Sequence, residues 1–138
     1  MAQPFQMKIN PRLALAVSGA LYVWSLALDA LRDRTDHIGF EVLAMGWMGV
    51  FTLTFAWYGN LFWLAGAIFL ARGKAPPLWV CLPGLLLAAT CLLGVTVGDD
   101  SGTYPATLLA GAYVWLASFL PQIAATLTAE RSLPRSRV

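Results

Sequence analysis

Four long stretches of apolar residues, almost without charge, dominate this sequence. They cover residues 13–31, 43–71, 78–97 and 105–128. A hydrocarbon layer of about 30 Å requires about 20 apolar residues in a helix, within a range of about 17–25, and each stretch reaches that range. The sequence therefore predicts an all-α fold, an integral membrane antiparallel four-helix bundle, followed by a flexible polar tail over residues 129–138.

Composition also favours lipid as the surrounding medium. Hydrophobic residues make up 59% of the 138 residues and charged residues 12%, whereas soluble domains average roughly 45–50% and 25%. A soluble protein of this size exposes much of its surface and needs polar side chains to cover it. We therefore expect one transmembrane domain, residues 1–138, within a lipid bilayer.

The basic residues are divided unevenly between the two ends of the expected bundle, and Lys and Arg are enriched on the cytoplasmic side of membrane proteins. This bias predicts a multi-pass protein of a bacterial-type inner (plasma) membrane, with both termini cytoplasmic. Cleavage of the first stretch as a signal peptide is the alternative, but Leu28 stands where a small residue is needed. One end carries Lys8, Arg12, Arg72, Lys74, Arg131, Arg135 and Arg137, and the other end carries Arg32 and Arg34.

Small and polar residues recur at helical spacing within the apolar stretches. Ser18, Tyr22 and Ser25 share one face of the first helix, and Ser118 and Gln122 share one face of the fourth. Small side chains allow helices to approach closely, and polar ones need partners away from lipid. We therefore expect these stripes to face the interior of the bundle.

Aromatic and amide side chains lie unusually deep in the expected bundle. Trp and Tyr usually lie at membrane interfaces, and a buried N–H or O–H without an acceptor costs a few kcal/mol. This layer is expected either to be a packed, hydrogen-bonded core or to line a cavity for a lipid, a quinone or an ion. The candidate ligand or partner contacts are Tyr22, Trp24, Asp29, Trp57, Tyr58, Asn60, Tyr113 and Trp115.

The loop after the first stretch contains the only histidine of the chain. Imidazole and carboxylates bind divalent metals, but one histidine among scattered acids is also typical of a solvated loop. We therefore expect no metal and no other cofactor. The candidates for a metal site are Asp33, Asp36, His37 and Glu41.

No complete catalytic motif occurs, so we expect a protein that is not an enzyme. The main functional prediction is an interaction or accessory subunit, or an immunity-like protein, that binds another membrane or periplasmic protein and could form a homo-oligomer. The alternative is a component that binds or transports a lipid, quinone or ion through the layer around Asn60. An enzyme acting through the loop residues is a third possibility, and the net charge of +2 argues against nucleic acid as a partner.

Overall fold

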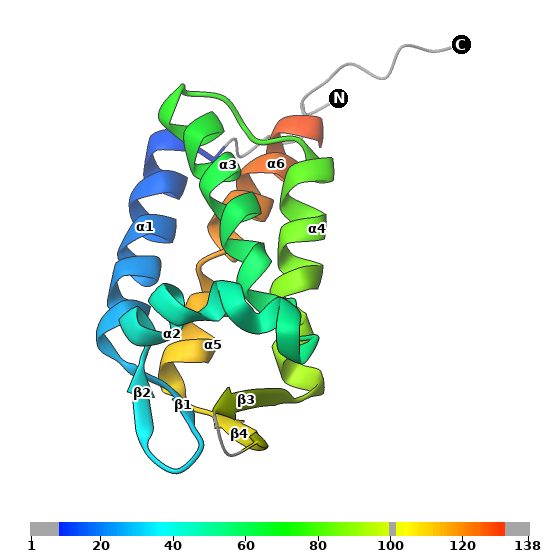
Figure 1. Cartoon of the computed structure of the whole chain (residues 1–138). Helices are drawn as coiled ribbons and strands as arrows, with labels where there is room; N and C mark the ends of the chain where they lie inside the picture. The colour runs from blue at the N-terminus through cyan, green and yellow to red at the C-terminus, as the bar shows by residue number, and fades with distance from the viewer. Residues whose placement is uncertain (1–8, 100–101, 132–138) are drawn as a thin grey trace, which may run out of the picture.

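The fold is a bundle of helices with a small β-sheet at one end (Figure 1). The structure, a computed structural model, describes residues 9–99 and 102–131, and helices make up 70% of these described residues. In chain order, with η for a 3-10 helix, the elements are α1 (Pro11–Ala27), β1 (Asp29–Arg32), β2 (Asp36–Ile38), α2 (Gly39–Met45), η1 (Gly46–Thr52), η2 (Ala56–Tyr58), α3 (Gly59–Ala71), α4 (Leu78–Ala89), η3 (Thr90–Leu93), β3 (Val95–Asp99), β4 (Gly102–Leu108), α5 (Ala110–Ala117) and α6 (Leu120–Arg131).

Helix α1 begins at a polar cap and ends earlier than predicted. Oδ1 of Asn10 accepts a hydrogen bond from the backbone N–H of Arg12 at 2.9 Å, and Pro11 occupies the first turn, where a missing N–H costs nothing. The helix ends at Ala27 rather than at residue 31, because Leu28 adopts an extended conformation and leads into β1.

The second apolar stretch is not one helix, so the predicted helix over residues 43–71 is wrong. Elements α2 and η1 lie across the side of the bundle, and α3 forms one of its rods (Figure 1). The chain reverses at Leu53, which has a φ of 56°, and the N–H of Thr54 donates to the carbonyl of Gly49 at 2.7 Å. A Cβ at Gly49 would overlap that part of the Thr54 backbone, so the turn requires glycine.

The third and fourth stretches also change from helix to strand at the end where the sheet lies. The third stretch is helical only to Leu93, and Pro105, expected close to a helix start, is instead paired with Thr96 in the sheet. The fourth rod consists of α5 and α6, and the helix is interrupted between Ala117 and Leu120, just before Pro121. Helix α6 continues to Arg131, and residues 132–138 of the predicted tail lie outside the described residues.

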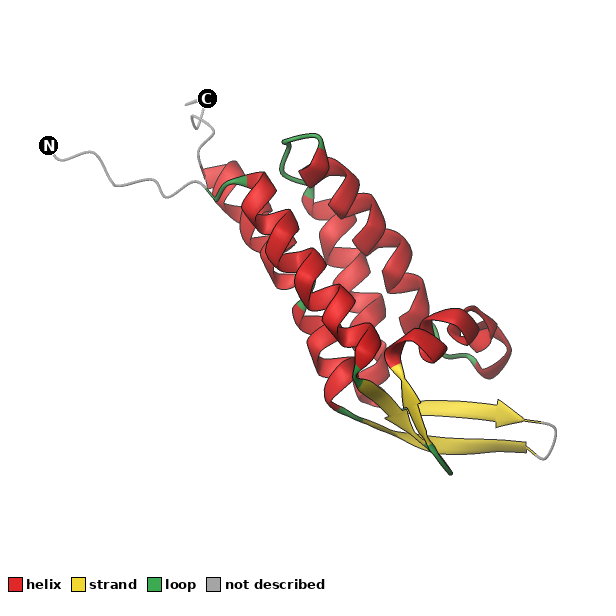
Figure 2. Cartoon of the chain, turned by 90° about the vertical axis from the view of Figure 1, so that its left-hand side faces the viewer, coloured by secondary structure: helices red, strands yellow, loops and turns green. Residues whose placement is uncertain are grey.

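The sheet corrects the all-α prediction. Its order is β2-β1-β4-β3, and each neighbouring pair is antiparallel (Figure 2). The two central strands are joined through Leu31 opposite Leu108 and Arg32 opposite Thr107. The sheet therefore links the connection after α1 to the connection before α5.

Helix length does not support four membrane-spanning helices. In the described part of the chain, one helical rod, α5 and α6 taken together over Ala110–Glu130 (21 residues), is long and apolar enough to cross a bilayer. The other apolar helices have 10–17 residues. They are shorter than predicted because the ends of the apolar stretches form the sheet and the separate α2–η1 segment.

Buried positions in the bundle hold small and polar side chains together with a few large apolar ones, such as Leu70 and Phe119, whereas many large apolar side chains are exposed. Burial confirms the predicted inward stripes, because Ser18 and Ser118 are 0% exposed and Gln122 is 1% exposed. Large apolar side chains lie on the outside instead, with Val23 66% and Leu86 61% exposed. Buried polar groups together with so many exposed large apolar side chains are unusual for a water-soluble domain.

Candidate functional site

A cavity of about 350 Å³ lies between the helices, the α2–η1 segment and the sheet. Its walls are mostly apolar and come from α1, α2, η1, η2, α3, η3, α5 and the strands. Such a volume lies at the lower end of the range for small-molecule sites. The residues that line this cavity include Tyr22, His37, Glu41, Trp57, Asn60, Ala112 and Trp115.

Asn60 is the centre of a hydrogen-bonded layer at the cavity wall. Its Oδ1 accepts from the hydroxyl of Tyr22 at 3.0 Å and from Nε1 of Trp115 at 2.8 Å. Its Nδ2 donates to the backbone carbonyl of Trp57 at 2.9 Å. Asn60 thereby joins α1, α3 and α5, and it supplies the acceptor that the deep aromatic side chains need.

The position of Asn60 follows from close contacts around the start of α3. Gly59 lies against the α4 backbone, where a Cβ would approach the carbonyl oxygen of Gly84 at 3.0 Å. One turn further along, the ring of Trp63 stacks on Tyr22 with a centroid distance of 4.1 Å. Glycine and ring stacking together hold α3 close to both α4 and α1.

A second polar cluster lies deeper in the bundle and is fully buried. The hydroxyl of Ser18 donates to the carbonyl of Ser118 at 2.6 Å. Nε2 of Gln122 donates to the Ser18 hydroxyl and to the carbonyl of Trp63, both at 3.2 Å. Gly66 makes room for the Gln122 amide, because a Cβ there would overlap its oxygen. Every buried side-chain N or O atom in the described residues has a hydrogen-bond partner. This cluster therefore holds the helices together through hydrogen bonds.

The structure brings together only part of the sequence-predicted layer. Tyr22, Trp57, Asn60 and Trp115 meet at the cavity. Four others lie elsewhere: Trp24 and Tyr113 are 58% and 55% exposed on the outer surface, Asp29 is exposed in β1, and Tyr58 donates to the carbonyl of Trp47 at 3.1 Å.

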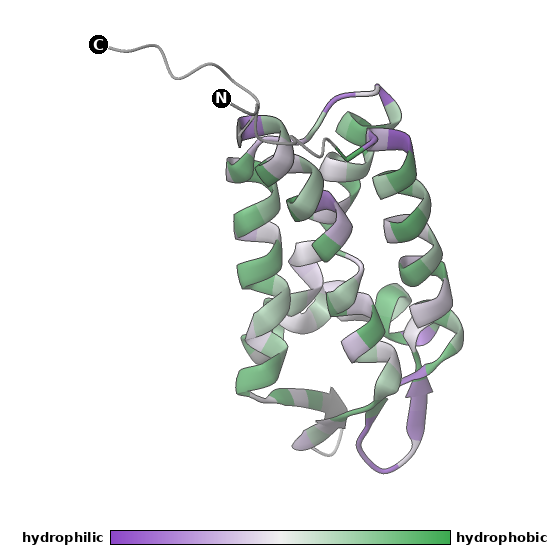
Figure 3. Ribbon diagram, turned by 180° about the vertical axis from the view of Figure 1, so that it is seen from behind, coloured by the Kyte–Doolittle hydropathy of each residue, from purple (hydrophilic) through white to green (hydrophobic). Residues whose placement is uncertain are grey.

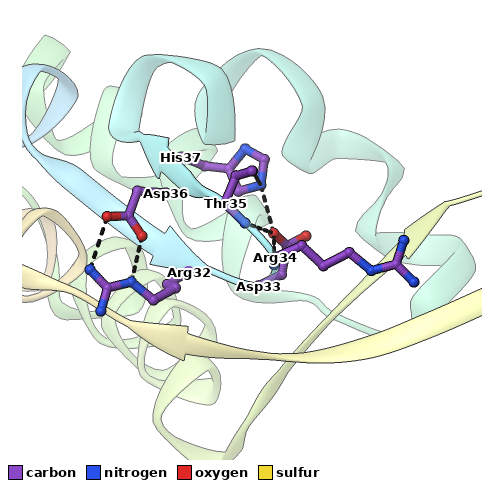
Figure 4. Close-up of polar contacts among 6 residues, drawn as sticks. All are labelled: Arg32, Asp33, Arg34, Thr35, Asp36 and His37. Carbon is purple, nitrogen blue, oxygen red and sulfur yellow. Dashed lines mark hydrogen bonds and ion pairs between the residues drawn. The ribbon is translucent and has the colours of Figure 1, made fainter.

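The β1–β2 hairpin holds the acidic candidates in two separate contacts (Figure 4). Nε and the NH2 group of Arg32 donate to the two carboxylate oxygens of Asp36, at 2.5 and 2.9 Å. Oδ1 of Asp33 accepts from the backbone N–H groups of Arg34 and Thr35 and from Nε2 of His37.

These contacts lower the pKa of both carboxyl groups. The backbone N–H of Thr35, and after it the His37 ring, holds the pKa of Asp33 below its ordinary value. The hydrogen bond from Arg32 lowers the pKa of Asp36 in the same direction. Both hydrogen bonds favour the charged carboxylate.

The hairpin residues do not fit a metal site. Both ring nitrogens of His37 face carboxylates, Nε2 at 3.1 Å from Asp33 and Nδ1 at 3.6 Å from Glu41. The carboxylate of Asp36 is in an ion pair with Arg32. Within residues 9–99 and 102–131, no group of three His, Cys, Asp or Glu residues could hold a metal ion. His37 and Glu41 instead line the cavity.

Sequence reasoning missed the wall that α2 and η1 contribute to the cavity. Leu43, Gly46 and Gly49 line this wall, but the predicted helix over residues 43–71 includes all three. The available signal was the length of the apolar stretch, which exceeds what one span requires. A stretch that is too long for one helix has to fold back or project.

Comparison with protein-family models, characterised proteins and solved structures finds no match to this chain. The site therefore has to be interpreted from its own geometry.

Proposed function

We propose that this chain is an integral membrane protein that binds a small, mainly apolar molecule in the cavity beside Asn60. The observation that carries the binding role is the cavity itself, whose apolar walls meet a hydrogen-bonded polar group at one place. Apolar walls with a few positioned polar groups are typical of small-molecule sites.

The distribution of charge supports the membrane location. No Asp, Glu, Lys or Arg occurs between Arg12 and Asp29 or between Glu41 and Arg72. The charged residues lie instead at the two ends of the bundle, near the sheet and near the start of α1 (Figure 3). An uncharged middle with exposed apolar side chains is stable in hydrocarbon but costly in water. The excess of Lys and Arg at the end opposite the sheet favours cytoplasmic termini and an external sheet.

The shorter helices are compatible with a thin bilayer. Helix α1 has 17 residues, which gives a length of about 26 Å at 1.5 Å per residue. The combined helices Ala56–Ala71 and Leu78–Leu93 are of similar length. A membrane adapts to such a mismatch by local thinning, at a cost of fractions of a kcal/mol per Å.

Asn60 defines which chemical group the bound molecule presents. Within the described residues, Nδ2 of Asn60 donates to Trp57 alone, so its second hydrogen is available to an acceptor. The bound molecule is therefore one with an apolar body and a carbonyl or hydroxyl oxygen. Binding, rather than catalysis, is the role that these groups support.

Filling the cavity tests this proposal. Ala112 lines the cavity from α5 and is 7% exposed, so Ala112→Leu places extra volume inside without removing a hydrogen bond. We expect molecules that co-purify with the wild-type protein in mild detergent to be lost from this variant. Native mass spectrometry, followed by solvent extraction and identification of the bound species, measures the loss.

The matched control is Ala110→Leu, because Ala110 lies on the same helix and is exposed. This variant is expected to retain the bound molecule at the wild-type level. Absence of any bound species in the wild type, or equal occupancy in both variants, would contradict the binding role.

A second candidate function is protein interaction through the sheet, as the sequence predicted for an accessory or immunity-like protein. In the described part of the chain β2 pairs only with β1, and β3 only with β4. Such edge strands offer backbone groups that a partner strand could pair with. Cross-linking in membranes from a cysteine at Thr96, which is exposed on β3, tests this role, and recovery of the uncross-linked chain alone would count against it.

A further inference from the structure

The segment from Phe40 to Phe55 presents large apolar side chains to the outside of the molecule. Phe51 and Leu53 are the most exposed, at 80% and 77%, and Phe40, Met45 and Trp47 are 60%, 59% and 52% exposed. Monomeric soluble proteins rarely expose so many neighbouring apolar groups.

This segment is held in place rather than loosely attached. Nε1 of Trp57 donates to the carbonyl of Leu43 at 2.7 Å, and the hydroxyl of Tyr58 donates to the carbonyl of Trp47 at 3.1 Å. Gly46 lies directly against the Trp57 ring, where a Cβ would overlap it. The outward apolar side chains are therefore presented by a defined backbone and need a partner.

The surface of the segment continues onto the outer face of α3. Leu61, Leu64 and Ile68 are 53%, 54% and 45% exposed, and the sequence from residue 42 to residue 71 contains no charged residue. A protein interface usually includes polar and charged groups at its rim. Apart from Glu41 at its start, which lies beside the hairpin residue His37, this surface carries no charge from the segment onto α3, and this favours lipid acyl chains as the occupant.

The opposite side of the same segment lines the cavity. Met45 and Met48 both line the cavity, and both are exposed, at 59% and 37%. These two side chains therefore lie between the cavity and the outside. Methionine is unbranched and flexible, so it readily changes conformation to admit a ligand.

We propose that the Phe40–Phe55 segment lies in the acyl-chain region of the outer leaflet and that the cavity opens to the lipid beside Met45 and Met48. The bound molecule is then a resident of the bilayer, such as a lipid or an isoprenoid, that enters sideways rather than from water. This inference rests on the proposed binding function and adds the source and class of the ligand.

Nitroxide labels on single cysteines test the proposal in the full chain reconstituted in phosphatidylcholine vesicles. Native Cys81 and Cys91 are buried and are replaced by alanine to give the unlabelled background. Labels are placed at Phe51→Cys on the outer surface and at Met48→Cys beside the cavity. Relaxation by oxygen, which concentrates in lipid, is compared with relaxation by a water-soluble nickel chelate.

Two further labels calibrate the measurement. Leu64→Cys reports on the outer face of α3, and Thr35→Cys reports on the exposed turn of the β1–β2 hairpin. We expect labels at positions 51 and 48 to shift towards oxygen, as at position 64, and the label at position 35 to shift towards nickel.

The outcomes separate the two claims. If the labels at positions 51 and 48 are relaxed mainly by the nickel chelate while the label at position 64 is relaxed mainly by oxygen, the claim that the segment faces lipid is wrong. The membrane location of the bundle is then still supported. Low accessibility to both reagents at position 51 shows that protein covers the segment, which also overturns the inference. Nickel accessibility at position 64 contradicts the membrane location itself.

Discussion

Asn60 combines two tasks within one side chain. Its oxygen satisfies two aromatic donors from different helices, and the residue also lines the cavity. A polar group inside a membrane bundle is stable only when it is paired, because lipid offers no replacement partner. The same pairing fixes the geometry that a bound molecule meets.

Removing this acceptor should destabilise the bundle. Asn60→Leu keeps the volume but leaves the Tyr22 hydroxyl and the Trp115 indole N–H unpaired, at an expected cost of about 2 kcal/mol in the free energy of unfolding. Tyr22→Phe removes one donor and leaves the Trp115 bond intact, so about 1 kcal/mol is expected. Thermal unfolding in one detergent measures both changes.

The matched control is Tyr113→Phe, which removes the hydroxyl of a residue that is 55% exposed. Its effect should be within about 0.5 kcal/mol, as for most surface substitutions. An Asn60→Leu variant as stable as this control would show that the aromatic side chains have other partners.

Among the elements, the α2–η1 segment packs against the bundle through glycines, which have no side chain at the points of contact. Gly39 lies against the Ser25 carbonyl and Gly46 against the Trp57 ring, and a Cβ at either position would overlap its neighbour. These glycines let the segment pack closely on the bundle and close the cavity wall.

Gly46→Ala should therefore destabilise the fold by about 1–3 kcal/mol, because the Trp57 ring has to move and overpacked sites are strained. Gly19→Ala should have the opposite sign. No atom lies within 4 Å of a Cβ at Gly19, and alanine within a helix is favoured over glycine by about 0.5–1 kcal/mol. Equal effects in thermal unfolding would contradict the close packing at Gly46.

The hairpin gives a prediction on pH dependence. Arg32 lowers the pKa of Asp36 in the folded state, so this pair contributes stability above the ordinary pKa of about 3.9 and loses it as the pH falls through the lowered value. Arg32→Gln should return the pKa of Asp36 towards the ordinary value, as measured by a carboxyl NMR titration.

Asp33 serves as the internal control in that titration. Its pKa is lowered chiefly by the backbone N–H of Thr35, which the substitution leaves in place. A rise of both values together would show that the hairpin has unfolded rather than lost one ion pair.

The elements that sequence analysis predicted well are those with a helical period. Ser18, Ser118 and Gln122 were expected inside, and they are buried. The short strands were not predictable, because residues 95–97 and 105–108 read as extensions of apolar helices. The reversal at Leu53 left no signal either, since leucine rarely adopts a positive φ.

The site was only partly predictable for the same reason. Spacing along helices identified Tyr22, Asn60 and Trp115, which contact one another. A position near the middle of an apolar stretch does not show whether a side chain faces inward or outward. Trp24 and Tyr113 are therefore among the predicted contacts although they are exposed. The cavity wall depends on tertiary folding of α2 and η1, which the hydrophobic period does not report.

The whole molecule has charge at its two ends, apolar side chains around its middle and polar groups inside. In the proposed membrane location, lipid removes the need for a polar exterior, and the inner hydrogen bonds replace those that water would provide. The cavity lies towards the sheet end of the bundle, and the proposal makes its apolar walls and its exposed methionines depend on a bilayer surrounding the helices.

Flotation of membranes from cells that express the full chain tests this dependence most directly. After a wash with sodium carbonate at high pH, which removes peripheral proteins, the chain should rise with the lipid through a sucrose gradient and leave it only when detergent is added. A chain that stays at the bottom as an aggregate, or remains in the wash as a dispersed monomer without detergent, would contradict a lipid-facing exterior.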